Sequence, residues 1–490
     1  MARKRYGALV LVAALAVAGV VVAYRTATFK SPVAFDPAQV RLAASIPIDN
    51  ARAAEHLGQA VQFQTVSHQD PAENQPAEWE KLHQWLQATY PAAHGAMTRQ
   101  IVASRTLIYT WPGSDPGLEP IILMAHQDVV PVAEGTEKAW RHPPFAGAVA
   151  EGAVWGRGSI DDKGSLVSLF EAADALAARG FKPRRTIYIV SGEDEEVSGH
   201  GAEAAASWFK AHGIMAQFVL DEGMVTVADN PVTHGPAALI GVAEKGYATL
   251  RVTARSAGGH SSTPPKETGV VTLAKAVVAI ADSPFPRHFD GPPAQMLQAL
   301  APHGPAAIRV FAANTWLFRP LLIMAFGSTP AGAAMLHTTI APTMLQGSPK
   351  ENVLPQAAMA RINYRIDPHD TSADIMDRAR TAVRGLPVEL TWEATPREAS
   401  PIASTTSDAW KLIAAAAAAG SQAPVAPALV IAGTDSRHMT GVAHDVYRYQ
   451  PLVLSMNGTE MIHGTNEHMT LDNLARMTDF YARLIATGAR

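Results

Sequence analysis

Three short, continuous apolar runs, each ending in polar side chains, constrain the fold of this chain more than any other feature. They cover Ile121–Ala125, Ile187–Val190 and Phe218–Leu220. Runs of this length are typical of strands buried on both faces, as in a parallel sheet. Between the first two runs, apolar residues recur at helical spacing over 166–176, and Gly180 follows at the stop position. The pattern predicts an α/β domain with a mixed, mostly parallel sheet and helices on both faces.

Histidine and carboxylate side chains follow all three runs. The first run is followed by His126 and Asp128, the second by Glu193, Asp194, Glu195 and Glu196, and the third by Asp221 and Glu222. Ligands bind beyond the carboxyl ends of such strands. The stretch "WGRGSIDDKGS" (155–165) precedes the predicted helix, and alone its aspartates would indicate only a helix cap. Because there is no cysteine, a metal site at this edge would use His, Asp and Glu ligands.

Length and charge exclude some classes of protein. A chain of 490 residues is too long for a single compact core, so we expect more than one domain. The formal net charge of -4 and the 17% of charged residues argue against nucleic acid as a partner.

The N-terminus resembles a membrane-targeting segment. Arg3, Lys4 and Arg5 precede an uncharged run from Gly7 to Tyr24, close to the ~20 residues of a membrane-spanning helix. We expect residues 1–30 to form a hydrophobic helix that anchors the protein in the inner membrane. The alternative is a signal peptide that is cleaved and releases a secreted protein. Either way the body of the protein would be exported, to the periplasm or outside the cell.

A histidine near the C-terminus completes a set of motifs. "EMIHGTNEHMT" places His463 in a polar loop before a helical pattern over 474–484. "HQD", "GRGSIDDKG", "EDEE", "LDEG" and "HGTNE" occur in the order found in the co-catalytic zinc peptidases of the aminoacylase and carboxypeptidase G type. The chain resembles this family from about residue 50 to its end. It is most similar to the branch of Gly-X carboxypeptidases and N-fatty-acyl-amino-acid hydrolases, with a zinc-exopeptidase-like fold.

The resemblance implies a site for two zinc ions, with cobalt or manganese as other possible metals. His126 and Asp221 would hold one ion, Glu196 and His463 the other, and Asp161 would bridge both. The peptide bond between Asp161 and Asp162 would be cis.

The resemblance also assigns catalytic roles. Glu195 would take a proton from the metal-activated water and pass it to the leaving amine, although from the residues alone Asp194 could share that role. Asp128 would orient the imidazole of His126, the alternative being a strand-end cap. The glycine-flanked His260, otherwise an ordinary loop residue, would reach the active site of a partner subunit and stabilise the oxyanion.

The middle of the chain predicts a different architecture. Apolar and polar residues alternate over 250–255 and again over 361–365, as in half-exposed antiparallel strands, and a helical stretch covers Gly269 to Ala281. This fits an inserted α+β, ferredoxin-like lid and dimerisation domain at 243–397, between catalytic parts at 45–242 and 398–490. The lid carries an apolar extension at 283–343, in which Arg319 and Pro320 interrupt the apolar run, so we do not expect a second membrane span there. The extension would be additional lid core, or an apolar wall or membrane-facing surface that accepts long acyl chains.

Enzymes of this kind bind a free carboxylate of the substrate, for which guanidinium groups are suited. The candidates are Arg365 and Arg437, with Asn352 and Thr434 as further substrate-binding residues; for each arginine, a surface ion pair is the alternative.

Together these features predict a membrane-anchored di-zinc amidohydrolase that acts on N-acyl amino acids or on the C-terminal residue of short peptides, and that forms a homodimer through the lid. Two alternatives stay open: a deacylase of an N-acylated biosynthetic intermediate, and a non-catalytic binding protein that retains the fold.

Overall fold

The structure is a computed structural model that describes residues 2–33, 35–197 and 199–490. Within these residues the largest sheet has the strand order β1-β2-β6-β3-β7-β17-β9-β8-β18, and β16 pairs with β9. In chain order its strands are β1 Thr98–Val102, β2 Thr106–Trp111, β3 Ile121–Met124, β6 Ile187–Ser191, β7 Ala216–Asp221, β8 Thr226–Asn230, β9 Gly235–Glu244, β16 Val425–Val430, β17 Ala443–Arg448 and β18 Val453–Leu454.

The three apolar runs form β3, β6 and β7 at the centre of this sheet. β3 pairs in parallel with both β6 and β7, and β17 continues the parallel arrangement beside β7. Ile121 and Leu123 belong to one hydrophobic cluster and Ile122 and Met124 to another, because successive side chains of a strand point to opposite faces. The predicted mixed α/β sheet is therefore confirmed.

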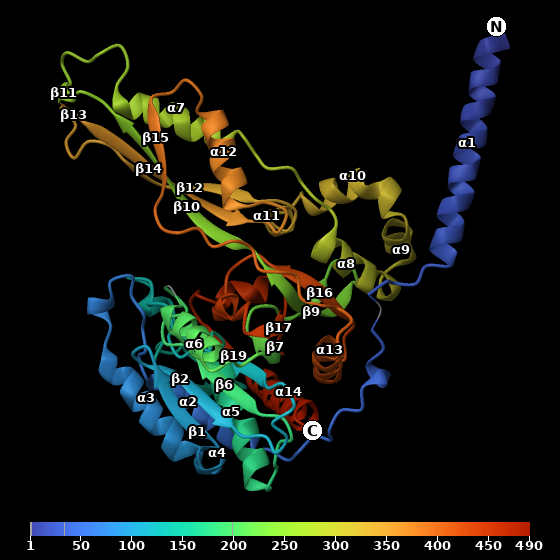
Figure 1. The fold of residues 1–490 in the computed structure, drawn as a ribbon, viewed down its shortest axis with the longest axis vertical. Helices are drawn as coiled ribbons and strands as arrows, with labels where there is room; N and C mark the ends of the chain where they lie inside the picture. The colour runs from blue at the N-terminus through green and yellow to red at the C-terminus, as the bar shows by residue number, and fades with distance from the viewer. Residues whose placement is uncertain (1, 34, 198) are drawn as a thin grey trace.

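Helices cover both faces of the sheet (Figure 1). One face carries α5 and α14, whose apolar residues share a cluster with Ile121 and Leu123, and the other carries α6. The helices of this part of the chain are α2 Asn50–Gln62, α3 Pro76–Thr89, α4 Pro91–Ala96, α5 Lys163–Ala178, α6 His200–Ala211, α13 Asp408–Ser421 and α14 Leu471–Gly488. A separate small sheet has the order β19-β5-β4, with β4 Ala148–Ala150, β5 Ala153–Trp155 and β19 His468–Thr470.

A second sheet stands above the first in Figure 1, with the order β12-β14-β10-β15 and all pairings antiparallel. Its strands are β10 Gly246–Arg255, β12 Thr339–Gln346, β14 Ala357–Ile366 and β15 Val388–Trp392, and its helices are α7 Gly269–Ala281 and α12 Ser372–Ala382. The predicted alternation holds in β10, where Leu250, Val252 and Ala254 are buried and the residues between them are more exposed. At the far end of this sheet, β11 Gly259–His260 pairs with β13 Val353–Leu354 (Figure 1).

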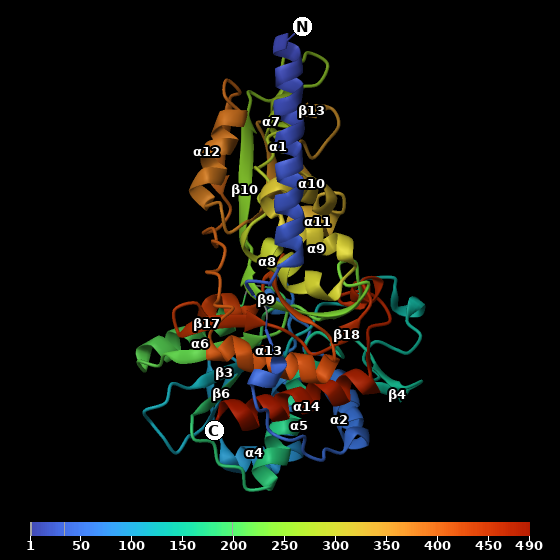
Figure 2. The same cartoon turned by 90° about the vertical axis from the view of Figure 1, so that its right-hand side faces the viewer.

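The apolar extension folds into four helices between the two sheets and α1 Ala2–Ala27: α8 Gly291–Leu300, α9 Ala306–Ala313, α10 Thr315–Phe326 and α11 Pro330–Ala334 (Figures 1 and 2). The apolar run is interrupted at Asn314 rather than at Arg319 and Pro320, and Pro320 lies inside α10. Over the described residues no single helix is long and apolar enough to cross a membrane, whereas α9 and α10 reach that length and apolarity as a pair bent by 116°.

Candidate active site

Loops at one edge of the large sheet bring the predicted site residues together. His126 lies two residues beyond β3, Glu195 and Glu196 lie beyond β6, and Asp161 precedes α5, which begins at Lys163. His463 lies in the loop before β19, with a positive φ of 60°. The peptide bond between Asp161 and Asp162 is cis, as the resemblance implied.

Asp161 is the centre of the cluster. One of its carboxylate oxygens lies 2.9 Å from Nε2 of His126, and the other lies 2.9 Å from Nε2 of His463. The same His463 nitrogen is 3.0 Å from Oε2 of Glu196. Two imidazoles and the carboxylate of Glu196, from segments up to 337 residues apart in the numbering (126 to 463), thus meet around Asp161.

At the end of β7 the structure places Glu222, not the predicted Asp221, beside His126. Oε1 of Glu222 is 3.6 Å from Nε2 of His126. The buried carboxylate of Asp221 instead accepts a hydrogen bond of 2.7 Å from the backbone N–H of Ser436. Because successive side chains at a strand end point to opposite sides, only one of two adjacent acids can face the cluster. The motif "LDEG" contains both, and the sequence offers no signal that selects between them.

Asp128 connects the cluster to the loop after β6. Its buried carboxylate accepts hydrogen bonds from the backbone N–H groups of Glu195 and Glu196, each 3.1 Å long, and from the hydroxyl of Ser67 at 2.5 Å. Nδ1 of His126 is 3.0 Å from the backbone carbonyl oxygen of Asp128 and 3.4 Å from its carboxylate. The main chain and the side chain of Asp128 therefore both contribute to orienting the imidazole.

A buried ion pair, which none of the sequence motifs indicated, joins the loop of Asp161 to the loop of His463. Oε2 of Glu467 accepts a 2.5 Å hydrogen bond from Nη1 of Arg157, and both side chains are buried. Oε1 of Glu467 accepts hydrogen bonds from the backbone N–H groups of Ile160 and Asp161, at 2.9 and 3.2 Å. Nη2 of Arg157 donates to the carbonyl oxygens of His463 and Gly464, both at 3.0 Å.

The electrostatics of the cluster match a site for cations. Burial raises the pKa of Glu222 well above its usual value, and it raises the pKa of Glu196 to about 7. Hydrogen bonds to Asp161 and Glu196 raise the pKa of His463 to about 10. Carboxylates that burial disfavours as anions become stable when cations lie among them. Within this cluster two sets of ligand atoms lie close enough to hold an ion: His126, Asp162 and Glu222, and His126, Asp161 and Glu196. These imidazole and carboxylate donors suit zinc.

Glu195 lies next to Glu196, with its side chain 10% exposed. Burial raises its pKa well above the usual value, and Nη1 of Arg437 is 3.5 Å from its Oε1. The carboxylate of Asp194 accepts hydrogen bonds from the backbone N–H groups of His200 and Gly201 at the start of α6, at 3.1 and 2.9 Å. Asp194 thus caps a helix, and the carboxylate of Glu195 lies beside Arg437.

Three arginines surround the junction between the two sheets. Arg365 lies over the ring of Tyr247, 5.0 Å from its centroid, and Arg397 lies over the same ring at 5.9 Å. Burial lowers the pKa of both guanidinium groups, and the positive charge of Arg437 lowers them further. Predicted Arg365 and Arg437 therefore lie in one basic region, to which the structure adds Arg397 and Tyr247. The buried Thr434 donates a 3.0 Å hydrogen bond to Glu244.

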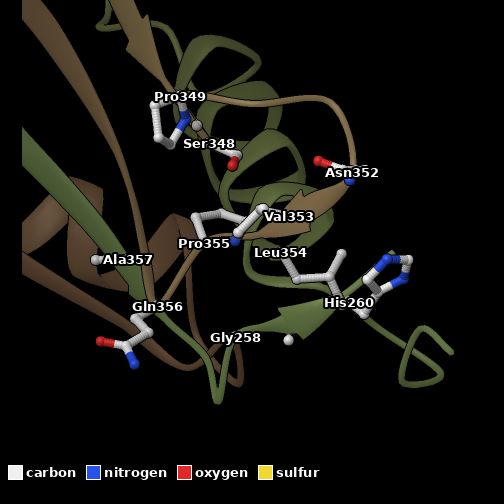
Figure 3. Close-up of a pocket in the computed structure, with 12 residues that line it drawn as sticks. Gly258, His260, Ser348, Pro349, Asn352, Val353, Leu354, Pro355, Gln356 and Ala357 are labelled. Atoms are coloured by element: carbon white, nitrogen blue, oxygen red, sulfur yellow. The ribbon is translucent and has the colours of Figure 1, made fainter. Parts of the chain in front are cut away.

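His260 and Asn352 lie away from this cluster, at the far end of the second sheet (Figures 1 and 3). His260 is exposed on β11, with Nδ1 2.8 Å from the hydroxyl oxygen of Ser262. Asn352 precedes β13, and both residues line a hollow of about 650 Å³. The structure thus brings these two predicted residues close to each other, but not to the catalytic cluster of their own chain.

Known proteins show the class to which this fold and site belong. Residues 122–487 match the family described as Peptidase family M20/M25/M40. The chain belongs to this family of metallopeptidases and is an enzyme of that class, as the motifs indicated.

Individual relatives resemble this chain over most of its length. A Dictyostelium discoideum protein described as "Probable carboxypeptidase S-like 2" is 33% identical over 440 residues, covering 88% of this chain and 84% of that protein. The "N-fatty-acyl-amino acid synthase/hydrolase PM20D1" of Mus musculus is 33% identical over 440 residues, covering 88% and 86%. The fold is similar to that of the M20 family metallo-carboxypeptidase Sso-CP2 from Sulfolobus solfataricus, with a TM-score of 0.65 at 14% identity over 89% of this chain and 98% of the other.

Proposed function

We propose that this protein hydrolyses the amide bond of N-acyl amino acids or of the C-terminal residue in short peptides. The observation that carries the proposal is the meeting of His126, Glu196 and His463 around Asp161, with Glu195 next to them. The names of the two relatives, a carboxypeptidase and an N-fatty-acyl-amino acid hydrolase, describe the same bond in two kinds of substrate.

Two divalent cations would be held by this cluster. Asp161 would reach both, His126 would bind the first and Glu196 with His463 the second. The distances favour Glu222 over Asp221 as the remaining ligand of the first ion, because Glu222 lies beside His126. When bound, zinc lowers the pKa of a water molecule and polarises a carbonyl oxygen, and cobalt or manganese accept the same imidazole and carboxylate ligands.

Glu195 is the proposed general base and acid. Its raised pKa suits a carboxylate that accepts a proton from the attacking water and delivers it to the leaving amine nitrogen. Arg437, 3.5 Å away, holds the carboxylate in place. Asp128 contributes indirectly, because its hydrogen bonds to the N–H groups of Glu195 and Glu196 fix the loop that carries both acids.

The basic region at the junction of the sheets would bind the free carboxylate of the substrate. Arg365, Arg437 and Arg397 approach it from both parts of the chain, and guanidinium groups bind carboxylates in a planar, bidentate manner. Thr434 would support the loop of Arg437, whose Nη1 donates to the Thr434 carbonyl oxygen at 2.8 Å. The hydroxyl of Thr434 is already bonded to Glu244.

Residues 243–397 would form a lid and dimerisation domain. The position of His260 and Asn352 at its far end supports a role in the active site of a second copy, where His260 would donate to the oxyanion and Asn352 would contact the substrate. The uncharged run of α1 supports export, either as an anchor in the inner membrane or as a cleaved signal peptide.

The test is turnover of a panel of N-acyl amino acids and dipeptides by metal-analysed protein and by Glu195→Gln. The variant should keep its metal and lose about 10²- to 10⁴-fold in kcat, the usual contribution of a general base. Glu55→Gln, on the exposed surface of α2, serves as the matched control and should keep full activity. Normal turnover by Glu195→Gln would refute the assigned role, and metal-loaded wild-type protein that cleaves nothing in the panel would refute the proposed activity.

A further inference from the structure

The helix α10 presents an apolar face to the surroundings of the molecule. Trp316, Leu317, Leu321 and Met324 are 54%, 42%, 48% and 63% exposed. Leu317, Leu321 and Met324 follow Trp316 by one, five and eight residues, which places all four side chains on one side of the helix. The opposite side packs inward: Leu322 is buried, and Phe326 and Phe318 make edge-to-face contacts with Phe289 and Phe311, with ring centroids 5.0 and 4.9 Å apart. The inner side thus fixes the helix, and the outer apolar face is left for another partner.

This face adjoins a second exposed apolar element, the helix α1. The elbow between α9 and α10 holds the C-terminal end of α1: Nε of Arg25 donates to the carbonyl oxygen of Ala313 at 3.2 Å, and the Asn314 side chain donates to the hydroxyl of Thr26 at 3.2 Å. Leu15, Val17 and Val20 of α1 are each more than 60% exposed. Figures 1 and 2 together show α1, α9 and α10 on the same side of the molecule.

We propose that the exposed apolar face of α10 forms a contact surface for a lipid bilayer. A bilayer is the expected partner of this face because the face begins beside the end of α1. The uncharged run of α1 follows a basic cluster, as in membrane-targeting segments. Within α10 the only charged residue is Arg319, whose Nη2 lies 3.1 Å from Oδ2 of Asp290 on the side of the helix away from the exposed face, so that face itself carries no charge. Trp316 lies in the first turn, as is common for aromatic residues at a membrane interface.

The bilayer contact goes beyond the proposed hydrolase activity. If the protein hydrolyses N-acyl amino acids as proposed, this surface would keep the active site beside the bilayer. Amphipathic N-acyl amino acids partition into the bilayer and would be concentrated there. Binding of α10 to lipid requires no turnover. A vesicle-binding measurement therefore tests this surface separately from the proposed hydrolase activity.

The test uses the full chain, whose lack of cysteine allows a single thiol to be introduced at each position. Leu321→Cys, Met324→Cys and the control Val278→Cys, which is 58% exposed on α7, are labelled with an environment-sensitive fluorophore. Each is mixed with vesicles of phosphatidylcholine and phosphatidylglycerol that carry nitroxide groups on some acyl chains. We expect a blue shift and quenching at positions 321 and 324, and unchanged emission at 278.

Two results would overturn the proposal. Labels at positions 321 and 324 that stay as water-exposed as the label at 278 would show that α10 does not meet lipid. A blue shift that occurs without vesicles and grows with protein concentration would assign the face to a second copy of the chain.

Discussion

Glu467 is the residue whose substitution tests most sharply how the site is held together. Its carboxylate accepts hydrogen bonds from Arg157 and from the backbone N–H groups of Ile160 and Asp161, and Arg157 in turn holds the carbonyl oxygen of His463. The change Glu467→Gln keeps the shape of the side chain and one carbonyl oxygen. It removes the charge and turns an amide N–H₂ toward the guanidinium of Arg157.

The loss of unfolding free energy expected for Glu467→Gln follows from the burial of the ion pair. Both partners are fully or almost fully buried, so the variant leaves an uncompensated guanidinium in the interior, which costs about 3–5 kcal/mol. Since the pair also orients the loops of Asp161 and His463, we expect metal affinity to fall about 10- to 100-fold, as for other residues that position metal ligands.

The assay is urea unfolding followed by tryptophan fluorescence, together with metal binding in competition with a chelator. The matched control is Glu389→Gln, because Glu389 and Arg255 form an exposed pair, 3.3 Å apart, worth about 1 kcal/mol or less. If Glu467→Gln unfolds at the same urea concentration as this control and binds metal like the wild type, the network does not hold the site and the reasoning is wrong.

Three further substitutions test individual assignments. Glu222→Gln should remove one of the two metal ions, whereas Asp221→Asn should keep both, since an amide oxygen still accepts the hydrogen bond from the backbone; elemental analysis of the purified variants distinguishes this from the reverse outcome, which would restore Asp221 as the ligand. Hydrogen bonds from Arg251 and Arg361 lower the pKa of Glu393 to about 2, so its contribution to stability is present above its ordinary pKa of 4.5 and is lost as the pH falls through about 2. The difference in Tm between wild type and Glu393→Gln should therefore shrink between about pH 5 and about pH 2, and a difference independent of pH would contradict the assignment.

The sequence predicted the central sheet because its signal is local. The runs that form β3, β6 and β7 are continuous and apolar, and the helix at Gly269–Ala281 has the bounds of α7. The break in the apolar extension was misplaced, because it depends on a tertiary contact. Asn314 interrupts the helix where its side chain bonds to α1, whereas Pro320 is accommodated within α10.

The sequence predicts those parts of the site that depend only on the types of the residues and on their order along the chain. His126, Asp161, Glu196 and His463 meet as the motifs implied, although hundreds of residues separate the first from the last. The choice between Asp221 and Glu222 depends on which side chain leaves the strand toward the cluster, a matter of register that composition does not encode. The Arg157–Glu467 pair was invisible for a related reason: each residue lies in a recognised motif, but only the folded chain brings the two within hydrogen-bonding distance.

Diffraction at the zinc absorption edge from crystals grown with zinc tests the central claim most directly. The account predicts two anomalous peaks, ~3.5–4 Å apart, that share Asp161. Nε2 of His126 should bind one ion and Nε2 of His463 the other, at about 2.0–2.1 Å. A map with no peak between these two histidines, or with zinc bound only elsewhere on the chain, would contradict it.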